Sequence, residues 1–218
     1  VNWTTANGTA TAPADFTASS GTASLPAAGC QCATVSIPVV GDLLYESTET
    51  FTVILSSPSV GTLGTATATG TIVADNDPKP VVTVAGVSQN EGNSGSTNQP
   101  FTITLTPASG RTASVTYTTQ SGTAASGSDF TFTTGSVTFA AGETTKTVNV
   151  PVIGDLAVEG NETFAVRLSG ASSANYGASR TGTGTIVNDD SGPVISANNV
   201  TKVEGNAGTA NAVFTVSL

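Results

Sequence analysis

The sequence of 218 residues contains no histidine and no methionine, and its only cysteines are Cys30 and Cys32. Without histidine, a Ser-His-Asp triad cannot be built and the commonest general base is missing. A zinc site is not expected either, because no histidine or further cysteine could complete a shell around the cysteine pair. These absences predict a protein that is not an enzyme.

The two cysteines stand two residues apart in a Cys-Gln-Cys triplet. On a strand they would point to the same face with about 6.5–7 Å between their Cα atoms, which is the far edge of disulfide reach. Two interpretations stay open: a local pair, either as two thiols or as one strained bridge, and a crosslink to another chain.

Basic residues are also scarce, since six lysines and arginines accompany 15 aspartates and glutamates and the formal net charge is −9. No basic patch is available to neutralise phosphates, so a nucleic-acid partner is not expected. No apolar run approaches the roughly 20 residues of a membrane-spanning helix, so membrane insertion of this segment is not expected. The sequence begins within a strand pattern, with neither an initiator methionine nor a signal peptide, and we expect a mature or excised part of a larger protein.

Glycine and small or β-branched residues are abundant, with 24 glycines among runs rich in threonine, serine, alanine and valine. This composition favours short strands joined by tight turns over helices. Seven strand-like runs lie near 81–87, 100–106, 113–119, 134–140, 145–152, 162–169 and 180–187. Seven short strands in about 110 residues predict an all-β fold, an immunoglobulin-like antiparallel β-sandwich.

The chain repeats itself with the period of a whole domain. The segment IPVVGDLLYESTETFTVILS matches VPVIGDLAVEGNETFAVRLS, and Asp42 stands 113 residues before Asp155 (155 − 42). A third copy opens near the C-terminus, where Glu204 again stands 113 residues after Glu91 (204 − 91). We therefore expect a partial domain at 1–79 that lacks its first two strands, a complete domain at 80–191, and the first two strands of a further domain at 192–218.

The acidic residues occupy the same places in each copy. Thirteen of the 15 stand at equivalent or adjacent repeat positions, in turns or at strand ends, and only Glu143 and Asp77 do not. Turns at one end of a sandwich converge, and carboxylates gathered there need a cation to neutralise them. Oxygen ligands without histidine or cysteine favour Ca²⁺. The alternative is that these acids cap turns through local hydrogen bonds.

Several motifs, in this order along the chain, resemble the Calx-beta domain family: Glu91-Gly-Asn, Gly-Ser-Asp129-Phe, Gly-Asp155 followed by Glu-Gly-Asn-Glu162-Thr-Phe, and Gly-Thr-Ile-Val-Asn-Asp189-Asp190. The family is known from the calcium sensor of sodium–calcium exchangers, from integrin β4 and from large bacterial surface proteins. The resemblance implies an extracellular or cell-surface location. It implies calcium ligands at Glu91, Asp129, Asp155, Glu159, Glu162, Asp189 and Asp190, and, in the first copy, at Asp15, Asp42, Glu46, Glu49 and Asp75.

The sequence departs from the exchanger domains, which carry denser acidic clusters, because Gly154, Leu156, Gly160 and Asn161 replace several possible carboxylates. Fewer charged ligands imply fewer ions and weaker binding, near the millimolar range of extracellular modules. Calcium is then expected to stiffen and stabilise the fold rather than to switch it.

Both ends of the chain fall at one place in the repeat, since Leu218 corresponds to Leu105 and Val1 to Val115. Residues 193–218 and 1–76 together would make one whole sandwich. Two interpretations stay open. The chain is a window from a longer repeat array, or separate subunits donate their last two strands to the next subunit and build a head-to-tail fibre. In both cases Glu204 would complete a first-copy site in a neighbouring unit.

We therefore expect a structural calcium-binding module of an extracellular stalk, adhesin or filament, with neighbouring copies of the same repeat as partners. The alternative is a binding module that presents loops to a receptor, a glycan or another surface ligand, although the aromatic content is only 6%. A calcium-signalling sensor and a hydrolase with paired carboxylates are further alternatives. Repetition of the acids in each copy favours metal binding over hydrolysis.

Overall fold

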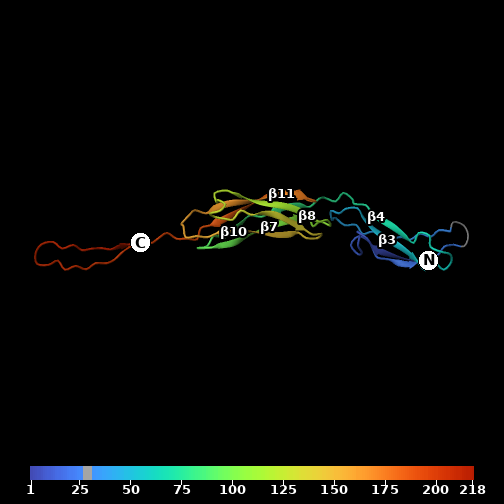
Figure 1. Ribbon diagram of the computed structural model, residues 1–218, viewed down its shortest axis with the longest axis horizontal. Helices are drawn as coiled ribbons and strands as arrows, with labels where there is room; N and C mark the ends of the chain where they lie inside the picture. The colour runs from blue at the N-terminus through green and yellow to red at the C-terminus, as the bar shows by residue number, and fades with distance from the viewer. Residues whose placement is uncertain (27–30) are drawn as a thin grey trace.

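The computed structural model describes residues 1–26 and 31–218, and the regular elements in this part of the chain are all β-strands. A single sheet within residues 1–76, a sandwich within residues 80–190 and a C-terminal hairpin follow one another along an elongated molecule (Figure 1). The predicted all-β class is confirmed. Among the described residues there is no helix of the length and apolarity that a membrane crossing requires. Cys30 lies outside the described residues, and Cys32 is exposed.

The sandwich consists of two sheets. One has the strand order β10-β7-β5-β12 and contains β5 (Val81–Val84), β7 (Ser96–Thr106), β10 (Thr145–Ile153) and β12 (Asn175–Tyr176). The other has the order β6-β13-β11-β8-β9 and contains β6 (Val87–Asn90), β8 (Ala113–Ser121), β9 (Thr134–Phe139), β11 (Glu162–Ser172) and β13 (Thr181–Val187). Neighbouring strands are antiparallel except for β5 with β12 and β6 with β13, which are parallel.

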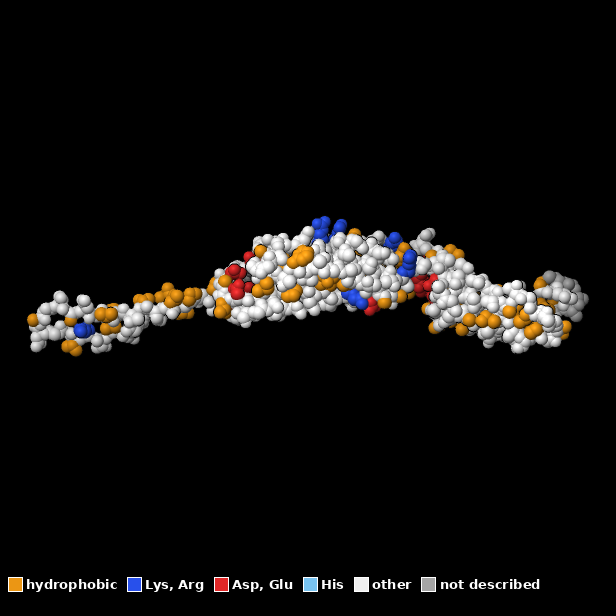
Figure 2. Space-filling model, in the orientation of Figure 1, with side chains coloured by type: hydrophobic (Ala, Val, Ile, Leu, Met, Phe, Trp, Pro, Cys, Tyr) orange, Lys and Arg blue, Asp and Glu red, His pale blue; other side chains and the backbone are white. Residues whose placement is uncertain are grey.

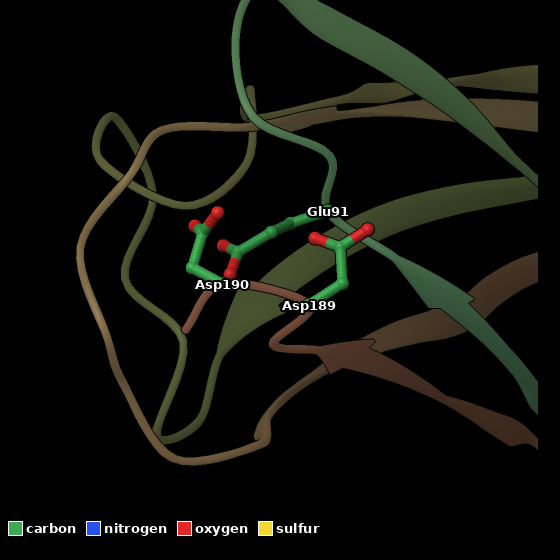
Figure 3. Close-up of side chains that lie close together, drawn as sticks. All are labelled: Glu91, Asp189 and Asp190. Carbon is green, nitrogen blue, oxygen red and sulfur yellow. The ribbon is translucent and has the colours of Figure 1, made fainter. Parts of the chain in front are cut away.

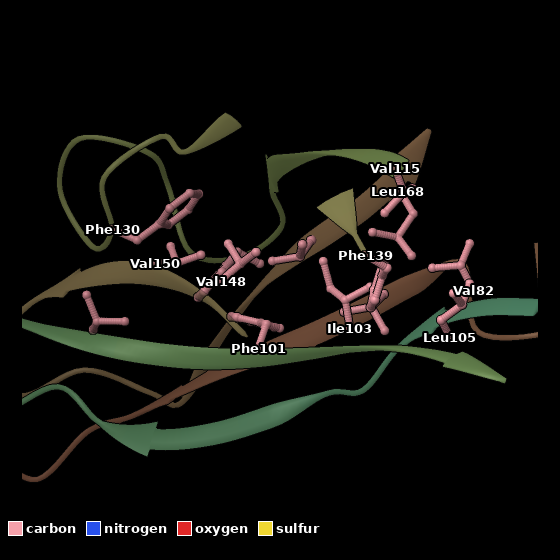
Figure 4. Close-up of a cluster of buried hydrophobic side chains, with 14 of the residues drawn as sticks. Val82, Phe101, Ile103, Leu105, Val115, Phe130, Phe139, Val148, Val150 and Leu168 are labelled. Carbon is pink, nitrogen blue, oxygen red and sulfur yellow. The ribbon is translucent and has the colours of Figure 1, made fainter. Parts of the chain in front are cut away.

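Alternating apolar residues of the two sheets face one another and form the core of the sandwich (Figure 4). In β7, Phe101, Ile103 and Leu105 have no exposed surface, as the period of two in a strand requires when one face is buried. The ring of Phe164 stacks on Phe130 with 4.4 Å between centroids and meets the edge of Phe101 at 5.7 Å. This cluster contains 17 buried apolar residues of the described chain, so the sandwich has a hydrophobic core of its own.

The run at 81–87, predicted as one strand, is two strands in different sheets. β5 ends at Val84, the chain crosses from one sheet to the other, and β6 begins at Val87. A Cβ atom at Gly86 would lie 2.9 Å from the carbonyl oxygen of Thr183, so the crossing needs a glycine. Apolar residues continue through the crossing, which is why the sequence indicated a single strand. The two-residue strand β12 is too short to have been predicted from periodicity.

The described residues within 1–76 form only one of the two sheets. Its strands are β1 (Asn2–Asn7), β2 (Ser20–Thr22), β3 (Glu49–Ser56) and β4 (Thr67–Ile72). Their order, β2-β1-β3-β4, repeats the order β9-β8-β11-β13 of the sandwich. The buried core of this first sheet consists of Ala10, Phe16 and Phe51, and the two phenylalanine rings stack at 4.6 Å.

Residues 32–40 correspond to β10 but do not form a strand. In the sandwich, β10 pairs with β7 along its whole length, from Thr145 with Thr104 to Ile153 with Ser96. The first sheet includes no counterpart of β7, so the backbone of residues 32–40 has no neighbouring strand with which to form a ladder.

The first sheet and the sandwich contact each other through two loops. The hydroxyl of the fully buried Ser109 donates a hydrogen bond to the carbonyl of Tyr45 at 3.2 Å. The cationic groups of Lys79 and Arg111 lie 5.7 and 5.5 Å from the centroid of the Tyr45 ring. These contacts hold the loop that precedes β3 against the sandwich.

Candidate metal centre

Acidic side chains gather at two places, the end of the sandwich from which the C-terminal segment leaves and the boundary between the first sheet and the sandwich (Figure 2). These places are the same end of two repeat copies, because Asp189 and its counterpart Asp75 both follow the last strand of their copy.

At the acidic end of the sandwich, parallel pairing brings two segments together. β6 and β13 run in the same direction, with Asn90 opposite Val187, so the residues that follow them emerge at one edge. The Glu91 amide donates to the Val187 carbonyl at 3.1 Å. The Gly92 amide donates to Oδ1 of Asp189, also at 3.1 Å. Glu91 and Asp189 are therefore neighbours although they are far apart in the sequence.

Glu91, Asp189 and Asp190 form the first acidic group. Figure 3 shows the extended side chain of Glu91 flanked by the carboxylates of the other two, and one oxygen of each lies within 4.8 Å of the others. Glu91 is only 5% exposed. Its Oε1 atom and the Oδ2 atom of Asp190 are buried without a hydrogen-bond partner. Such orphaned carboxylate oxygens are costly, and a cation between them would remove that cost.

The electrostatics of this group also favour a cation. Burial raises the pKa of Glu91, and the negative charges of Asp155, Glu159, Asp190 and Asp189 raise it further. In the described part of the chain, the only salt bridge joins Lys146 to Glu143, which lies outside the group. The acids are therefore not neutralised by a basic side chain.

Asp129, Glu159 and Glu162 form the second acidic group, again with one oxygen of each within 4.8 Å of the others. Burial raises the pKa of Glu162, as do its hydrogen bond with Asp129 and the charges of Asp129, Glu159 and Glu91. Burial acts to raise the pKa of Asp129 as well, but hydrogen bonds from the Ala125 amide and from Ser128 and Glu162 lower it overall. Because Glu91 acts on Glu162, the two groups belong to one acidic end.

Asp155 belongs to neither group. Its Oδ1 atom accepts a hydrogen bond from the Ala157 amide at 2.7 Å, which is the turn-capping role that the sequence left open. Its charge still acts on Glu91. The preceding Gly154 sets this position, since its amide donates to the Gly95 carbonyl at 3.0 Å and a Cβ atom there would lie 2.7 Å from the carbonyl oxygen of Glu91.

In the first copy, all five candidate ligands line one hollow of about 160 Å³: Asp15, Asp42, Glu46, Glu49 and Asp75. Two of them also cap turns. Asp15 accepts from the Thr11 amide at 2.6 Å, and Asp42 accepts from the Leu44 amide at 2.7 Å. Burial raises the pKa of Glu46, and the charges of Asp42, Asp15, Glu49 and Asp77 raise it further.

Asp77 lines the same hollow, although it has no acidic counterpart in the second copy, where Ser191 stands at that place. A hydrogen bond with Asp75 raises the pKa of Asp77, and burial and the charges of Asp75 and Asp42 act in the same direction. Its spacing of two from Asp75 in an extended segment places both side chains on one side of the chain, and this signal could have identified it.

Glu204 is not brought to either acidic end of its own chain. It is exposed on the C-terminal hairpin, whereas its counterpart Glu91 is the only buried acid in the described part of the chain. The hollow of the first copy thus contains five repeat-equivalent carboxylates but not the one that the sandwich buries most deeply.

The residues at the acidic end of the sandwich fit a hard cation. All the candidate ligands are carboxylate oxygens, the donors that Ca²⁺ prefers. Asn93 orients Asp190 by donating to its Oδ1 atom at 2.8 Å, and this leaves the orphaned Oδ2 atom for an ion. Glu91 and Asp190 would hold such an ion with Asp189.

Comparison with known families identifies the class of protein. A model of the Calx-beta domain matches residues 1–78 and again residues 75–190. The two matches cover most of the chain, so the protein belongs to the Calx-beta family and contains tandem copies of its calcium-binding domain. The predicted resemblance is confirmed. The family is one of calcium-binding domains and not of enzymes.

Several solved structures are similar to the chain. The apo form of the Calx CBD1 domain is 25% identical, with a TM-score of 0.46, over 50% of this chain and 99% of that domain. The calcium binding domain CBD12 of CALX1.1 is 24% identical, with a TM-score of 0.48, over 54% of this chain and 50% of that one. CBD12 from CALX1.2 is 19% identical, with a TM-score of 0.44, over 85% of each chain. No curated protein matches the chain.

Proposed function

We propose that this chain is a structural calcium-binding module of an extracellular stalk, adhesin or filament. The observation that carries the proposal is the buried Glu91, whose Oε1 atom has no partner and lies beside Asp189 and Asp190. An ion held there ties the ends of β6 and β13 together and neutralises the acids around them. Calcium then acts on the stability of the folded module.

The arrangement of the copies supports a structural role. The molecule is elongated, with the first sheet and the sandwich end to end (Figure 1). The loop that carries Glu46 packs against the sandwich, since Tyr45 accepts a hydrogen bond from Ser109. A Cβ atom at Gly110 would lie 2.8 Å from the carboxyl carbon of Glu46, so an acid of the hollow touches the next module. Ion binding at this junction would stiffen the shaft, and neighbouring copies of the repeat are the partners that extend it.

Calcium titration of the full chain tests the proposal, with the melting temperature as the readout. At calcium concentrations about tenfold above Kd, a site stabilises the fold by about 1.4 kcal/mol. For a domain of this size the shift is about 5–10 °C. EGTA should reverse it.

Two matched variants identify the site. Glu91→Gln should abolish most of the shift, because it removes the buried carboxylate. Glu143→Gln removes the same charge from the same sandwich but lies outside both acidic groups, and it should leave the shift intact. No shift at millimolar calcium, or equal responses of the two variants, would leave turn capping as the role of these acids.

A further inference from the structure

We propose that the hairpin at residues 194–218 of one copy of this chain covers the open face of the first sheet in a second copy, and carries Glu204 into the acidic hollow there. The contribution of the ion rests on the proposed calcium-binding function, whereas the apolar part of the joint does not. The joint is an interaction surface between identical chains, and it contains a metal site that neither copy completes alone.

The acceptor is the uncovered face of the sheet β2-β1-β3-β4. Val53 and Leu55 on β3 are only half-buried, whereas their counterparts Val166 and Leu168 are fully buried beneath the second sheet of the sandwich. A hollow of about 460 Å³ lies beside Leu55 and is lined by further apolar residues, Val1, Leu25, Val60 and Leu63. In the sandwich, the equivalent positions Val115 and Leu168 share a core with Val82 of β5 and Leu105 of β7.

The donor has the shape of the missing strands. β14 (Ser196–Ala197) and β15 (Val216–Ser217) pair Ser196 with Ser217 and Ala197 with Val216. This is the register of β5 with β7, where Thr83 pairs with Thr104 and Val84 with Ile103. The hairpin therefore already holds the pairing that it would need inside a sandwich.

The donor also exposes the side chains that such a sandwich would bury. Ile195, Phe214, Val216 and Leu218 are 70%, 61%, 67% and 82% exposed. Their counterparts Val82, Phe101, Ile103 and Leu105 have no exposed surface. An apolar hairpin with open edges is a template for further pairing. Val213 would remain outside, since its counterpart Pro100 is exposed.

A glycine in the acceptor gives an independent indication of this occupant. In the sandwich, Gly154 must be a glycine because the backbone at Glu91 and Gly92 passes directly over it. Its counterpart Gly41 would meet nothing within 4 Å if it carried a Cβ atom. The first copy has a glycine at the place where the backbone at Glu204 and Gly205 would pass.

Glu204 links this packing to calcium. In the sandwich, Glu91 reaches the acidic end directly after β6. A hairpin seated in the same register would place Glu204 in the hollow that is lined by Asp15, Asp42, Glu46, Glu49 and Asp75. Such a collection of carboxylates requires a cation, so calcium should promote the joint.

The acceptor has to belong to another copy. In each molecule the sandwich lies between the hairpin and the first sheet, which are at opposite ends (Figure 1). Joining hairpin to sheet between copies repeats the same contact at each step, and a heterologous contact of this kind extends into an open chain.

Cysteine crosslinking of the full chain tests the register of the joint. Thr34 and Thr215 correspond to Thr147 and Thr102, which are paired across β10 and β7. In a Cys30→Ser, Cys32→Ser background, Thr34→Cys with Thr215→Cys should give a ladder of covalent multimers under mild oxidation. The matched control is Thr34→Cys with Thr201→Cys. Thr201 corresponds to Ser88 of β6, which lies in the other sheet, so this pair should give no ladder.

Sedimentation velocity of the full chain, with calcium or with EGTA, tests the contributions of apolar packing and of the bound ion to the joint. Phe214→Asp should abolish assembly in both conditions, and it should still fold because Phe214 is exposed in the single chain. Glu204→Gln should remove the enhancement by calcium. Glu91→Gln, the same substitution at the equivalent position of the sandwich, should retain it.

Three results would overturn the joint: a wild-type chain that stays monomeric in calcium, a Phe214→Asp variant that still assembles, or ladders of equal yield from both cysteine pairs. Equal assembly in calcium and EGTA, or equal behaviour of Glu204→Gln and Glu91→Gln, would overturn the role of Glu204. The melting temperature separates these failures from the proposed function. A calcium shift without assembly contradicts only the joint, and assembly without any calcium shift contradicts the calcium-binding function.

Discussion

The first sheet and the sandwich are two copies of one sequence pattern with very different interiors. Both stack a loop phenylalanine on a strand phenylalanine, Phe16 on Phe51 and Phe130 on Phe164, with 4.6 and 4.4 Å between centroids. The sandwich then adds a second sheet and buries 17 apolar residues, whereas the first copy buries three in the described part of the chain. The local motif survives without the second sheet, but the extended core does not.

The two copies also differ in a single strand, since the segment of the first copy that corresponds to β10 does not form one. Val39 and Val152 occupy the same repeat position, and both take part in a bridge to the stacked phenylalanine of their copy. Val152 is fully buried in a strand of the sheet, whereas Val39 is 55% exposed in a segment that forms an isolated bridge but no strand ladder. The difference shows that β-structure here depends on a neighbouring strand and a covering face, as expected for a propensity that mainly reflects context.

Truncating the strand phenylalanine of each copy should give the largest difference. Phe164→Ala should destabilise the sandwich by about 3–5 kcal/mol, the usual cost of emptying a large buried site. Phe51→Ala should cost less than half of that, because its surroundings include an open face. Urea denaturation measures both values. In a Tyr45→Phe background, the single tryptophan, Trp3 of β1, reports on the first copy, and the remaining tyrosines, Tyr117 and Tyr176, report on the sandwich. Equal costs would show that the first copy has a closed core in solution.

Adding one methyl group at the equivalent glycines should give the next largest difference. Gly154→Ala forces the loop away from Glu91 and should cost about 1–3 kcal/mol, as overpacking does. It should also weaken calcium binding by the sandwich. Gly41→Ala should stay within about 0.5 kcal/mol of wild type in the single chain, because nothing lies within 4 Å. Urea denaturation of the monomer checks both, and a large effect of Gly41→Ala would show that its surroundings are already filled.

Calcium should give a smaller difference in stability between the two copies than these substitutions do. The sandwich holds both groups of three neighbouring carboxylates found in the described residues, and the first copy lacks its equivalent of Glu91. In dilute monomer, calcium at tenfold over Kd should therefore raise the free energy of unfolding of the sandwich by about 1.4 kcal/mol, and the urea midpoint seen by tyrosine should rise accordingly. The midpoint seen by Trp3 should move less. A larger movement of the Trp3 signal would place the stronger site in the first copy.

Much of the fold could be predicted from the sequence because the pattern of each predicted strand occurs in a second copy of the repeat. The acidic end was predictable for the same reason, since Asp129, Glu162 and Asp189 recur with their counterparts. Its division into two groups was not, because it depends on the parallel pairing of β6 with β13, which pairs residues nearly a hundred positions apart. Asp77 was missed because only the first copy carries it.

The sequence also could not indicate which strands would form in the first copy. Periodicity reports which face of a segment is apolar, but not whether a partner is present to pair with it. Residues 32–40 repeat the pattern of β10 and still do not form a strand. The copies also differ in residue type at some positions, and a substitution there should change the stability of one copy only.

The turn after β9 and the start of β10 contain such a difference, because the sandwich has Glu143 and Lys146 where the first copy has Cys30 and Ala33. The Lys146 amine lies 2.7 Å from Oε2 of Glu143, and the Ala140 amide donates to the same oxygen at 2.8 Å. The hydrogen bond from Lys146 lowers the pKa of Glu143, and that from Ala140 lowers it further.

A lowered pKa in the folded state stabilises the fold above the unfolded pKa, and this contribution is lost as the pH falls through the folded value. Glu143→Gln should therefore give the smallest loss of stability, confined to the sandwich signal and reduced by salt, since exposed ion pairs contribute little. Melting curves of both proteins at neutral and acidic pH should converge at the acidic end, and a loss that persists there would show that the side chain acts by packing instead of charge.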